Sequence, residues 1–592
     1  MTRLVFLIIL ITFQAFLFAQ KTQVTFNLDM VTVENPAEVG IRGGVAPLSW
    51  EKTTYLTDED GDGVFTGTFN FETDQKIVEY KFVNQHDQFE LKKQGNRILL
   101  LNGDKKEVFQ AFDQHTFFKY EEVENLTFTP DQLKEDIAIL KKCMEYLHPN
   151  LYRYADKAQF EKNFAELENN LINEPDYLSV YASMLKFVST IKCSHTIVNS
   201  WNQSQLTRMA LIGQSDKVPF TFKIIGDRIL IDKNASKDVM LTTGLELLSL
   251  NGVKTQDMIA NLLQYTTADG SRDAKRLNLM ELSGEERYEP FDIVYTAVYG
   301  FYKQHQLKLK NHETGEVFEL VVDGMSGKKR KEILNSKYPE FANKFANIWE
   351  FKELEPEVGY LRLGSFSVYL FDFNWKDFLK DAFSQTINKK YKHLVIDIRG
   401  NGGGMTEVVE FLLQRIIIEP VSVELVQNKT NYQSVPDDLR QYIGTWDKLP
   451  YDFGNKVEQM PDGSYKYKNG TQIRNYKPMK NGFKGKTYVL IDASNSSATH
   501  TMATVVKKHN LGTLIGQETG GNQKGINGGY MFFTNLPNTT IEVDIPVMGV
   551  YDDPNKPDAG ISPDVTVQPT IEDVINKRDP ELEKTLEIIH NN

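Results

Sequence analysis

The segment from about residue 356 to 570 constrains the fold most, because short apolar runs alternate there with helical patterns. The run VGYLRLGSF precedes a helical pattern over 373–389, HLVIDIRGNGGG precedes one over 406–416, and KTYVLI precedes a third. Buried strands that alternate with helices form a largely parallel sheet covered by those helices. We therefore expect an α/β core over 350–570, with an insertion over 425–480 that is rich in Tyr, Asn and Lys.

The N-terminus predicts export. Residues 1–19 begin with the basic residue Arg3, continue with an apolar stretch from Leu4 to Phe18 and end on Ala19. This pattern is typical of a secretory signal peptide that is cleaved after the small residue. An uncleaved anchor is the alternative, but the apolar stretch is shorter than the ~20 residues that a membrane helix needs. We expect a periplasmic or extracellular protein with no stable membrane span after cleavage.

Composition favours several ordinary globular domains and disfavours nucleic acid as a partner. The chain has 592 residues, 41% of them hydrophobic, and carries 67 Lys and Arg against 80 Asp and Glu, a net charge of −13. At ~150 residues per domain, three or four domains are expected. A sequence-independent nucleic-acid binder needs a cationic surface, which so acidic a chain does not favour.

Metal binding is not predicted. The two cysteines, Cys143 and Cys193, are too few for a zinc site, and no HExxH motif is present. They could form a disulfide if their Cα atoms lie within about 7 Å, or they could stay as two buried thiols. Phe69 stands where a calcium loop would need its closing Glu, so we expect only a polar hairpin turn at the three alternating acids, Asp58, Asp60 and Asp62.

Short β-type runs separated by turns predict a β-sandwich over residues 20–115. The order GGVAPLSW, DEDGDGVFTGTF, VEYKFV and GNRIL resembles the carbohydrate-binding modules that bind starch and glycogen, and this resemblance implies a glycan as a partner. Trp50 and Tyr80 fall where such modules place sugar-stacking or core aromatics. Of these two roles, we expect the core for Trp50.

Three further parts follow the sandwich or end the chain. Apolar residues recur at helical spacing after Thr129-Pro130, which predicts a helical region over 125–215. Strands, turns and a helix at 256–263 resemble a PDZ module over 216–325, with an insertion around 265–300. A PDZ module captures chain ends by β-augmentation, and a purely structural module is the equal alternative. We expect one C-terminal helix over 571–592.

Three segments carry residues suited to catalysis. In VLIDASNSSATHTMATVV a buried strand leads through a serine-rich turn into a helix, whose first N–H groups attract negative charge. In HLVIDIRGNGGG a strand leads into a glycine-rich turn that allows close backbone approach and suits an oxyanion hole. The third segment is Ser194-His195. Taken alone, the serine turn is more often a helix cap, and a lone His is usually structural.

Six motifs in this order, CSHT, VGYLRLGSFS, VIDIRGNGGG, NSSATH, GQETGG and GISPDV, resemble the serine peptidases of the tail-specific (C-terminal processing) and tricorn-core family. The resemblance covers about 125–570. It implies a multidomain α/β protein in which the helical region is the N-terminal part of the peptidase. The core over 350–570 is then of the crotonase-like (ClpP/crotonase) type.

The resemblance also implies roles for individual residues. Ser497 falls at the nucleophile position, with Ser496 and Ser494 as rivals one and three positions away. The oxyanion hole would be formed by backbone N–H groups, one from Gly403 or Gly402 and one from Ala498.

The general base has two candidates. Tricorn-like members use a His preceded by Ser, as in Ser194-His195, whereas tail-specific members use a Lys after a GxTxxGKG turn. Lys524 follows GQETGGNQ with two more residues than that pattern carries, so we favour His195, which also titrates near neutral pH. His500, one helical turn after Ser497, is a departure from the family.

The acidic partner of the base is expected near the C-terminus in the tricorn-like pattern. Asp558, just before GISPDV, lies near the expected place, and its rivals are Asp552, Asp553 and Glu518.

The sequence thus predicts an exported serine endopeptidase that acts on peptides or proteins without a cofactor. The main alternative is a catalytically inactive scaffold with the same fold that binds peptide or glycan. A glycan-active enzyme would need paired carboxylates, and no pair is evident. The oligomeric state is not predicted.

Overall fold

The computed structural model describes residues 21–92, 95–101, 103–114, 123, 125–286, 288–338, 348–425, 428–468, 472–551, 553 and 555–591. The predicted signal peptide and Asp552 lie outside these residues. The chain divides into two compact units, Met1–Thr116 and Phe117–Asn592.

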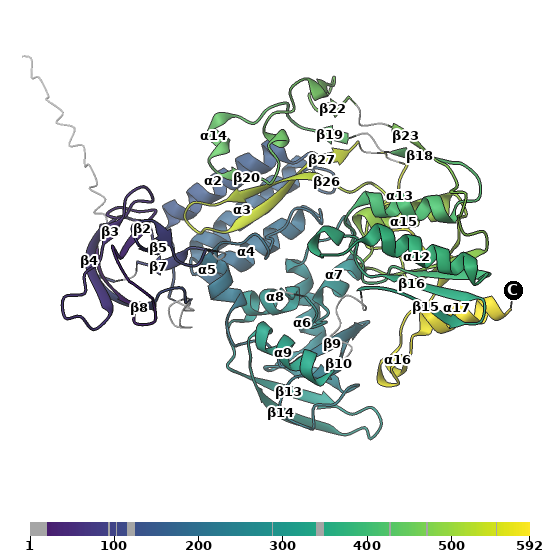
Figure 1. Ribbon diagram of the computed structural model, residues 1–592, viewed down its shortest axis with the longest axis horizontal. Helices are drawn as coiled ribbons and strands as arrows, with labels where there is room; N and C mark the ends of the chain where they lie inside the picture. Colours follow the sequence, from purple (N-terminus) through teal and green to yellow (C-terminus); the bar gives the residue numbers. More distant parts are fainter. Residues whose placement is uncertain are drawn as a thin grey trace, which may run out of the picture. The chain divides into compact units, whose positions relative to one another are not determined.

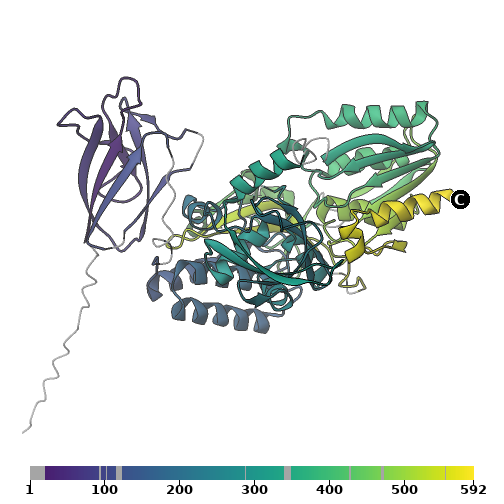
Figure 2. The ribbon, with the colours of Figure 1, turned by 90° about the horizontal axis from the view of Figure 1, so that it is seen from below.

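The first unit consists of two sheets around one apolar core (Figure 2). One sheet has the order β4-β1-β8, and the other has the order β3-β2-β5-β6 with β7 beside β5. Along β1 every second residue is buried, as expected for a strand with one face on a core. The strands are β1 (Lys21–Asp29), β2 (Gly40–Gly43), β3 (Thr54–Tyr55), β4 (Val64–Glu72), β5 (Ile77–Asn84), β6 (Gln88–Phe89), β7 (Arg97–Leu100) and β8 (Lys105–Ala111).

The two aromatic residues singled out in this unit have different places. Tyr80 is 1% exposed and packs edge-on against Phe26 in the core. Trp50 is 37% exposed, so the expected core role for Trp50 is wrong. The reason is local, because Trp50 lies in the connection between β2 and β3 and not on the inward face of a strand.

The three aspartates before β4 form a polar turn, as predicted. Asp58 accepts the N–H groups of Gly61 at 2.8 Å and Gly63 at 3.1 Å, and Asp62 accepts that of Val64 at 2.8 Å. These carboxylates therefore bond the backbone of their own turn.

The second unit begins with helices α2 (Pro130–Leu147), α3 (Lys157–Asn173) and α4 (Tyr177–Thr190). Thr129 caps α2 in a capping box with Gln132, and Pro130 occupies the first turn. Both cysteines are buried and unpaired thiols, Cys143 on α2 and Cys193 after α4.

An antiparallel sheet of order β14-β13-β11-β10-β9 follows, with β12 beside β11. Its strands are β9 (Phe220–Ile225), β10 (Arg228–Asn234), β11 (Glu246–Leu250), β12 (Val253–Lys254), β13 (Gln304–Lys310) and β14 (Val317–Asp323). The predicted helix at 256–263 is α6 (Thr255–Leu262). The segment predicted as an insertion holds α7 (Asp273–Met280) and α8 (Pro290–Tyr299), and α9 (Gly327–Lys337) follows β14.

The core sheet has the order β15-β16-β17-β24-β25-β28 and is parallel except for the pair β15–β16. One face is covered by α12 (Trp375–Asn388), α13 (Thr406–Ile416) and α15 (Ser497–Lys508), and the other by α17 (Pro580–His590) (Figure 1). The strands are β15 (Trp349–Glu355), β16 (Val358–Leu363), β17 (His393–Asp397), β24 (Lys486–Ile491), β25 (Thr513–Gly516) and β28 (Val565–Thr566). The predicted α/β core is present.

The predicted insertion over 425–480 joins a further sheet of order β20-β26-β27-β19-β22-β21. The long strands β26 (Gly528–Asn535) and β27 (Glu542–Val550) are extended by β19 (Asn428–Thr430), β20 (Ile443–Gly444), β21 (Val457–Gln459) and β22 (Tyr465–Tyr467). At the two ends of the insertion, β18 (Val421–Leu425) pairs with β23 (Gln472–Tyr476).

The predicted single C-terminal helix is in fact two, α16 (Ile571–Ile575) and α17. The side chain of Asp579 caps α17 and Pro580 occupies its first turn, which starts a new helix at this point. Within the described residues, no helix combines the length and apolarity that crossing a bilayer requires.

Candidate active site

The two glycine- and serine-rich turns lie side by side at one edge of the core sheet. Strands β17 and β24 are parallel neighbours, with Asp397 opposite Leu490. Because neighbouring parallel strands end at the same edge, the chain leaves both strands into adjacent loops. One loop is the glycine-rich segment 398–404, and the other is the serine turn 492–497.

Ser497 has an unusual backbone geometry. It is the first residue of α15, it is half-buried, and its φ of +50° is rare for a residue with a side chain. The rivals differ: Ser494 Oγ donates to Asp492, and the buried Ser496 Oγ has no hydrogen-bond partner among the described residues.

The glycine-rich loop approaches Ser497 closely. A Cβ placed on Gly403, whose φ is +118°, would lie 2.8 Å from the Cβ of Ser497 and 3.1 Å from the Ala498 nitrogen. The first N–H groups of a helix have no intrahelical acceptor, so the Ala498 N–H is available to an anion. The Gly403 N–H donates to Asn401 Oδ1 at 2.9 Å, whereas the exposed Gly402 has no such bond within the described residues.

Two polar side chains hold these loops together. Asp492 Oδ2 accepts the Gly400 N–H at 2.9 Å, and its Oδ1 accepts the Ser494 N–H at 3.0 Å. Asn495, fully buried, donates through Nδ2 to the carbonyl of Ile398 at 2.6 Å and to that of Asn401 at 3.0 Å.

His195 is joined to an acid through Ser194. Ser194 Oγ lies 3.2 Å from His195 Nδ1 and donates to Asp269 Oδ2 at 2.6 Å, and the Ser194 N–H donates to Asp269 Oδ1 at 3.0 Å. The other ring nitrogen, Nε2, lies 3.8 Å from where a Cβ on Gly528 would stand. Burial lowers the pKa of His195; the Asp269 carboxylate opposes this and the Lys275 ammonium adds to it.

Lys275 connects this group to the serine turn. It is 8% exposed, and its Nζ donates to the carbonyl of Ser494 at 2.8 Å. Burial lowers the pKa of Lys275, while the carboxylates of Asp492 and Asp269 raise it.

The predicted acid Asp558 bonds other groups. Its Oδ1 accepts the Ser271 N–H at 3.1 Å and Asn522 Nδ2 at 2.6 Å. Burial raises the pKa of Asp558, but these hydrogen bonds outweigh it and leave the pKa below its usual value. Among the rivals, Glu518 pairs with Arg272 at 2.8 Å, and Asp553 accepts the N–H of Asn555.

The two other candidates for proton transfer also have partners of their own. Lys524 Nζ lies 5.8 Å from the centre of the Tyr154 ring. His500 is buried, its Nδ1 lies 2.9 Å from Thr519 Oγ1, and burial lowers its pKa to about 4, helped by the cations of Arg272 and Lys556.

Motif reasoning missed Asp269 and Lys275. Asp269 lies in an irregular stretch and Lys275 in the helix that follows it, both more than two hundred residues before the serine turn, and neither belongs to a recognisable spacing. Their proximity to the site comes from contacts that span 75 residues (Ser194–Asp269) and 219 residues (Lys275–Ser494).

Part of the chain is similar to a known family of peptidases. Residues 357–567 match the model of peptidase family S41. The solved structure of mature CPAF complexed with lactacystin is 14% identical, with a TM-score of 0.52 over 78% of this chain and 97% of that one, which shows a shared fold. Two further structures are the photosystem II D1 C-terminal processing protease and the tricorn protease. The first is 14% identical over 74% of this chain and 93% of that one, with a TM-score of 0.34; the second is 12% identical over 88% and 42%, with a TM-score of 0.33.

No curated protein sequence matches the chain. The match of residues 357–567 to peptidase family S41 indicates a serine-type peptidase. The core domain of the chain is thus similar to the S41 peptidases.

Proposed function

We propose that the chain is an exported serine endopeptidase that hydrolyses peptide bonds through Ser497. His195 Nε2 takes the hydroxyl proton while Ser497 Oγ attacks the peptide carbonyl. The resulting oxyanion is held by the N–H of Ala498 and by a glycine N–H of the 402–403 loop. His195 returns the proton to the leaving amine, and water then releases the acyl group by the same steps in reverse.

The observation that carries this proposal is the backbone of Ser497. A residue with a positive φ at the first position of a helix holds its side chain out from a tight turn, with the free N–H groups of the first helical turn close by. Of the two glycines, Gly402 has the unengaged N–H, and Gly403 would have to exchange its bond to Asn401.

His195 is the better base of the two candidates. A neutral imidazole can accept a proton near neutral pH, and the contact of Ser194 with Nδ1 leaves Nε2 as the ring nitrogen that can act on the Ser497 hydroxyl. Lys524 shares its surroundings with Tyr154 and Asp558, so no contact of its ammonium supports a role at Ser497. Export rests on residues 1–19 alone.

A fluorophosphonate probe tests this proposal, because it labels only an activated serine. The mature chain should be labelled and should cleave casein; Ser497→Ala should lose both, and His195→Ala should lose most of both. Ser496→Ala and Lys524→Ala are the matched controls and should keep them. Undiminished labelling of Ser497→Ala would overturn the nucleophile, and loss in Lys524→Ala with retention in His195→Ala would overturn the base. A wild type that binds unstructured peptides but is neither labelled nor active would favour the inactive scaffold.

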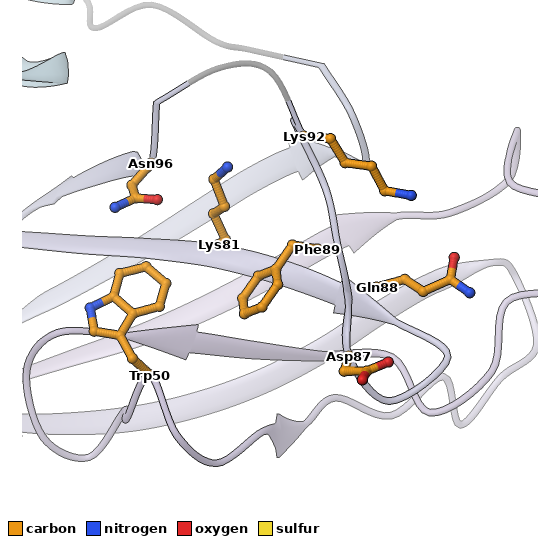
Figure 3. A pocket seen from close by; sticks show the side chains of 7 residues that line it. All are labelled: Trp50, Lys81, Asp87, Gln88, Phe89, Lys92 and Asn96. Carbon is orange, nitrogen blue, oxygen red and sulfur yellow. The ribbon is translucent and has the colours of Figure 1, made fainter. Parts of the chain in front are cut away.

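A second function, glycan binding by the first unit, is favoured by a hollow on its surface. The hollow has a volume of about 570 Å³ and is lined by Trp50, Lys81, Asp87, Gln88, Phe89, Lys92 and Asn96 (Figure 3). The Trp50 and Phe89 rings both line the hollow, together with the five polar side chains. Aromatic faces beside amide, carboxylate and ammonium groups suit a sugar ring, which has apolar faces and a polar edge.

Titration with maltoheptaose, followed by calorimetry on the mature chain, tests this second function. Trp50→Ala should abolish binding, and Trp201→Ala, which removes an equally exposed tryptophan from the other unit, should leave it unchanged. Absence of binding in the wild type, or equal binding by Trp50→Ala, would contradict a glycan site in this hollow.

A further inference from the structure

We propose that the segment from Asp269 to Lys275, which lies outside the matched family domain, supplies the two charged positioning residues of the active site. Asp269 orients His195 through Ser194, and Lys275 holds the serine turn and adds a positive charge to the surroundings of His195. This inference rests on the proposed peptidase function. It assigns the acidic role to Asp269 in place of Asp558.

The hydrogen bonds at Ser194 fix the direction of donation from His195 through Ser194 to Asp269, a chain that we call the relay. A carboxylate can only accept, so the Ser194 hydroxyl proton is committed to Asp269 Oδ2. Ser194 Oγ is then the acceptor for His195 Nδ1, which must carry the ring proton. The tautomer that results leaves the lone pair on Nε2, as a general base requires.

Asp269 is itself held in place. It is 2% exposed, both of its carboxylate oxygens accept from Ser194, and its backbone carbonyl accepts Asn522 Nδ2 at 3.2 Å. Asp558 Oδ1 accepts from the same nitrogen, Asn522 Nδ2, and also from the Ser271 N–H. Asp558 therefore supports the loop that carries Asp269, one step further from His195.

Lys275 places a positive charge between the relay and the serine turn. Its ammonium donates to the Ser494 carbonyl, and its stem passes Gly520, where a Cβ would lie 2.8 Å from Lys275 Cδ. The charged groups that act on Lys275 are Asp492, the first residue of the serine turn, and Asp269, which accepts from Ser194. In Figure 1, α7, which carries Lys275, lies between the antiparallel sheet and the core sheet.

The two charges act on His195 in opposite directions. Asp269 favours the imidazolium that forms when Nε2 takes the Ser497 proton, and Lys275 disfavours a proton on the ring of the resting enzyme. Four other titratable groups belong to the same surroundings. They are the thiol of Cys193, which directly precedes Ser194 in the chain, the Tyr154 hydroxyl, the Asp558 carboxylate and the Lys524 ammonium. Burial has the largest effect on the pKa of His195 and, together with Lys275, outweighs Asp269, so the ring stays a base at a pH at which an isolated imidazole would be partly protonated.

The Asp269 assignment is tested with Asp269→Asn against Asp558→Asn, measured as kcat/KM on a peptide substrate and as the rate of fluorophosphonate labelling. Asparagine cannot accept through both side-chain atoms, so one Ser194 bond is lost and the tautomer is no longer enforced. We expect at least a tenfold loss in Asp269→Asn and less than a threefold loss in Asp558→Asn. The reverse order, or equal losses, would overturn the assignment.

The Lys275 assignment is tested with Lys275→Gln, which keeps a donor for the Ser494 carbonyl and removes the charge. The acid limb of its pH–kcat/KM profile should move roughly 0.5–1 pH unit to higher pH, because the imidazolium is no longer repelled. Lys275→Arg should restore the wild-type limb. The matched control is Lys217→Gln, another buried lysine that donates to a carbonyl, that of Leu211, away from the site.

A uniform loss at every pH in Lys275→Gln, with an unshifted acid limb, would show a purely structural lysine and overturn the assignment. If Lys275→Gln does not fold, the test uses Lys275→Arg instead. The acid limb of its pH–kcat/KM profile is expected to coincide with that of the wild type, and a shifted limb would overturn the assignment. Failure of the peptidase proposal gives a different result, since the wild type itself would then stay unlabelled, or Ser497→Ala would be labelled.

Discussion

Asp492 binds Gly400 across the gap between two loops: the Asp492 Oδ2 accepts the Gly400 N–H at 2.9 Å, while its other oxygen accepts from Ser494. One carboxylate thus sets the distance between the glycine-rich loop and the serine turn. Because both loops leave neighbouring parallel strands, this short link is enough to fix Gly403 against Ser497.

Replacement of that carboxylate should loosen the site. In Asp492→Asn one acceptor is lost, and we expect a loss of about 1–3 kcal/mol in the free energy of unfolding together with reduced kcat. Asp452→Asn is the control, since Asp452 accepts a single N–H, that of Gly454, in an exposed turn. Chemical denaturation and peptide hydrolysis measure the two effects; an Asp492→Asn variant as active as the control would contradict the role.

A methyl group on Gly403 should block the site. In Gly403→Ala the new Cβ would meet Ser497 Cβ at 2.8 Å and the Ser496 carbonyl at 2.9 Å, in addition to the strain of a φ of +118°. We expect kcat to fall by two orders of magnitude or more, the scale of losing an oxyanion-hole donor. Gly463→Ala shares the positive φ, +85°, but has no neighbour within 4 Å, so its activity should stay normal. Comparable kcat values for the two variants would refute this geometry.

Arg399 should matter more for stability than any exposed ion pair. It bonds the buried Asp397 at 3.0 and 2.7 Å and reaches Asp579 and Glu581 at the start of α17. Loss of one partner from a buried pair costs about 3–5 kcal/mol. We expect such a loss for Arg399→Met in urea unfolding.

The exposed pair of Arg578 with Glu583 provides the comparison for Arg399, and Arg578→Met should cost less than about 1 kcal/mol. Similar costs for the two methionine variants would argue against the buried network as the anchor of α17.

The pair Glu542 and Asp544 should make the protein more stable in mild acid. Burial raises the pKa of Glu542 to about 8, with help from the Asp544 carboxylate, and burial raises that of Asp544 to about 6. A raised carboxyl pKa means that the folded state prefers the protonated form. This contribution is therefore full below the unfolded pKa of about 4.5 and is lost as the pH rises through 6 to 8.

Glu542→Gln should remove part of that pH dependence. At pH 8.5 we expect it to stabilise the protein by on the order of 1 kcal/mol, since one pKa unit corresponds to about 1.4 kcal/mol and solvent screens part of the effect. The exposed Glu458→Gln is the control. Thermal melts at pH 5.5 and 8.5 measure it, and parallel shifts in wild type and Glu542→Gln would contradict the assignment.

The regular elements of the core could be predicted because their periodicity is local. Helix α13 occupies 406–416 as expected, since Val408, Leu412 and Ile416 recur at helical spacing and are all buried. The serine turn and the glycine-rich loop are also local signals, each a strand followed by a turn and a helix.

The charged part of the site could not be predicted in the same way. Asp269 and Lys275 are single residues without a motif, and their positions depend on how the antiparallel sheet and the core pack together. Trp50 failed for a related reason, because spacing along a strand says nothing about a residue in a connection between strands. The C-terminal acid, Asp558, was placed by analogy, but it accepts hydrogen bonds from Ser271 and Asn522, whereas Ser194 donates to Asp269.

The order of the site residues along the chain has a consequence for biosynthesis. His195 precedes Ser497 by roughly three hundred residues, and chains emerge from the ribosome N-terminus first. A nascent chain therefore carries the proposed base, His195, long before the proposed nucleophile, Ser497, exists. Under the proposed mechanism, a fragment that stops short of α15 cannot cut itself or its neighbours through this centre, and cleavage waits until the serine turn has been made.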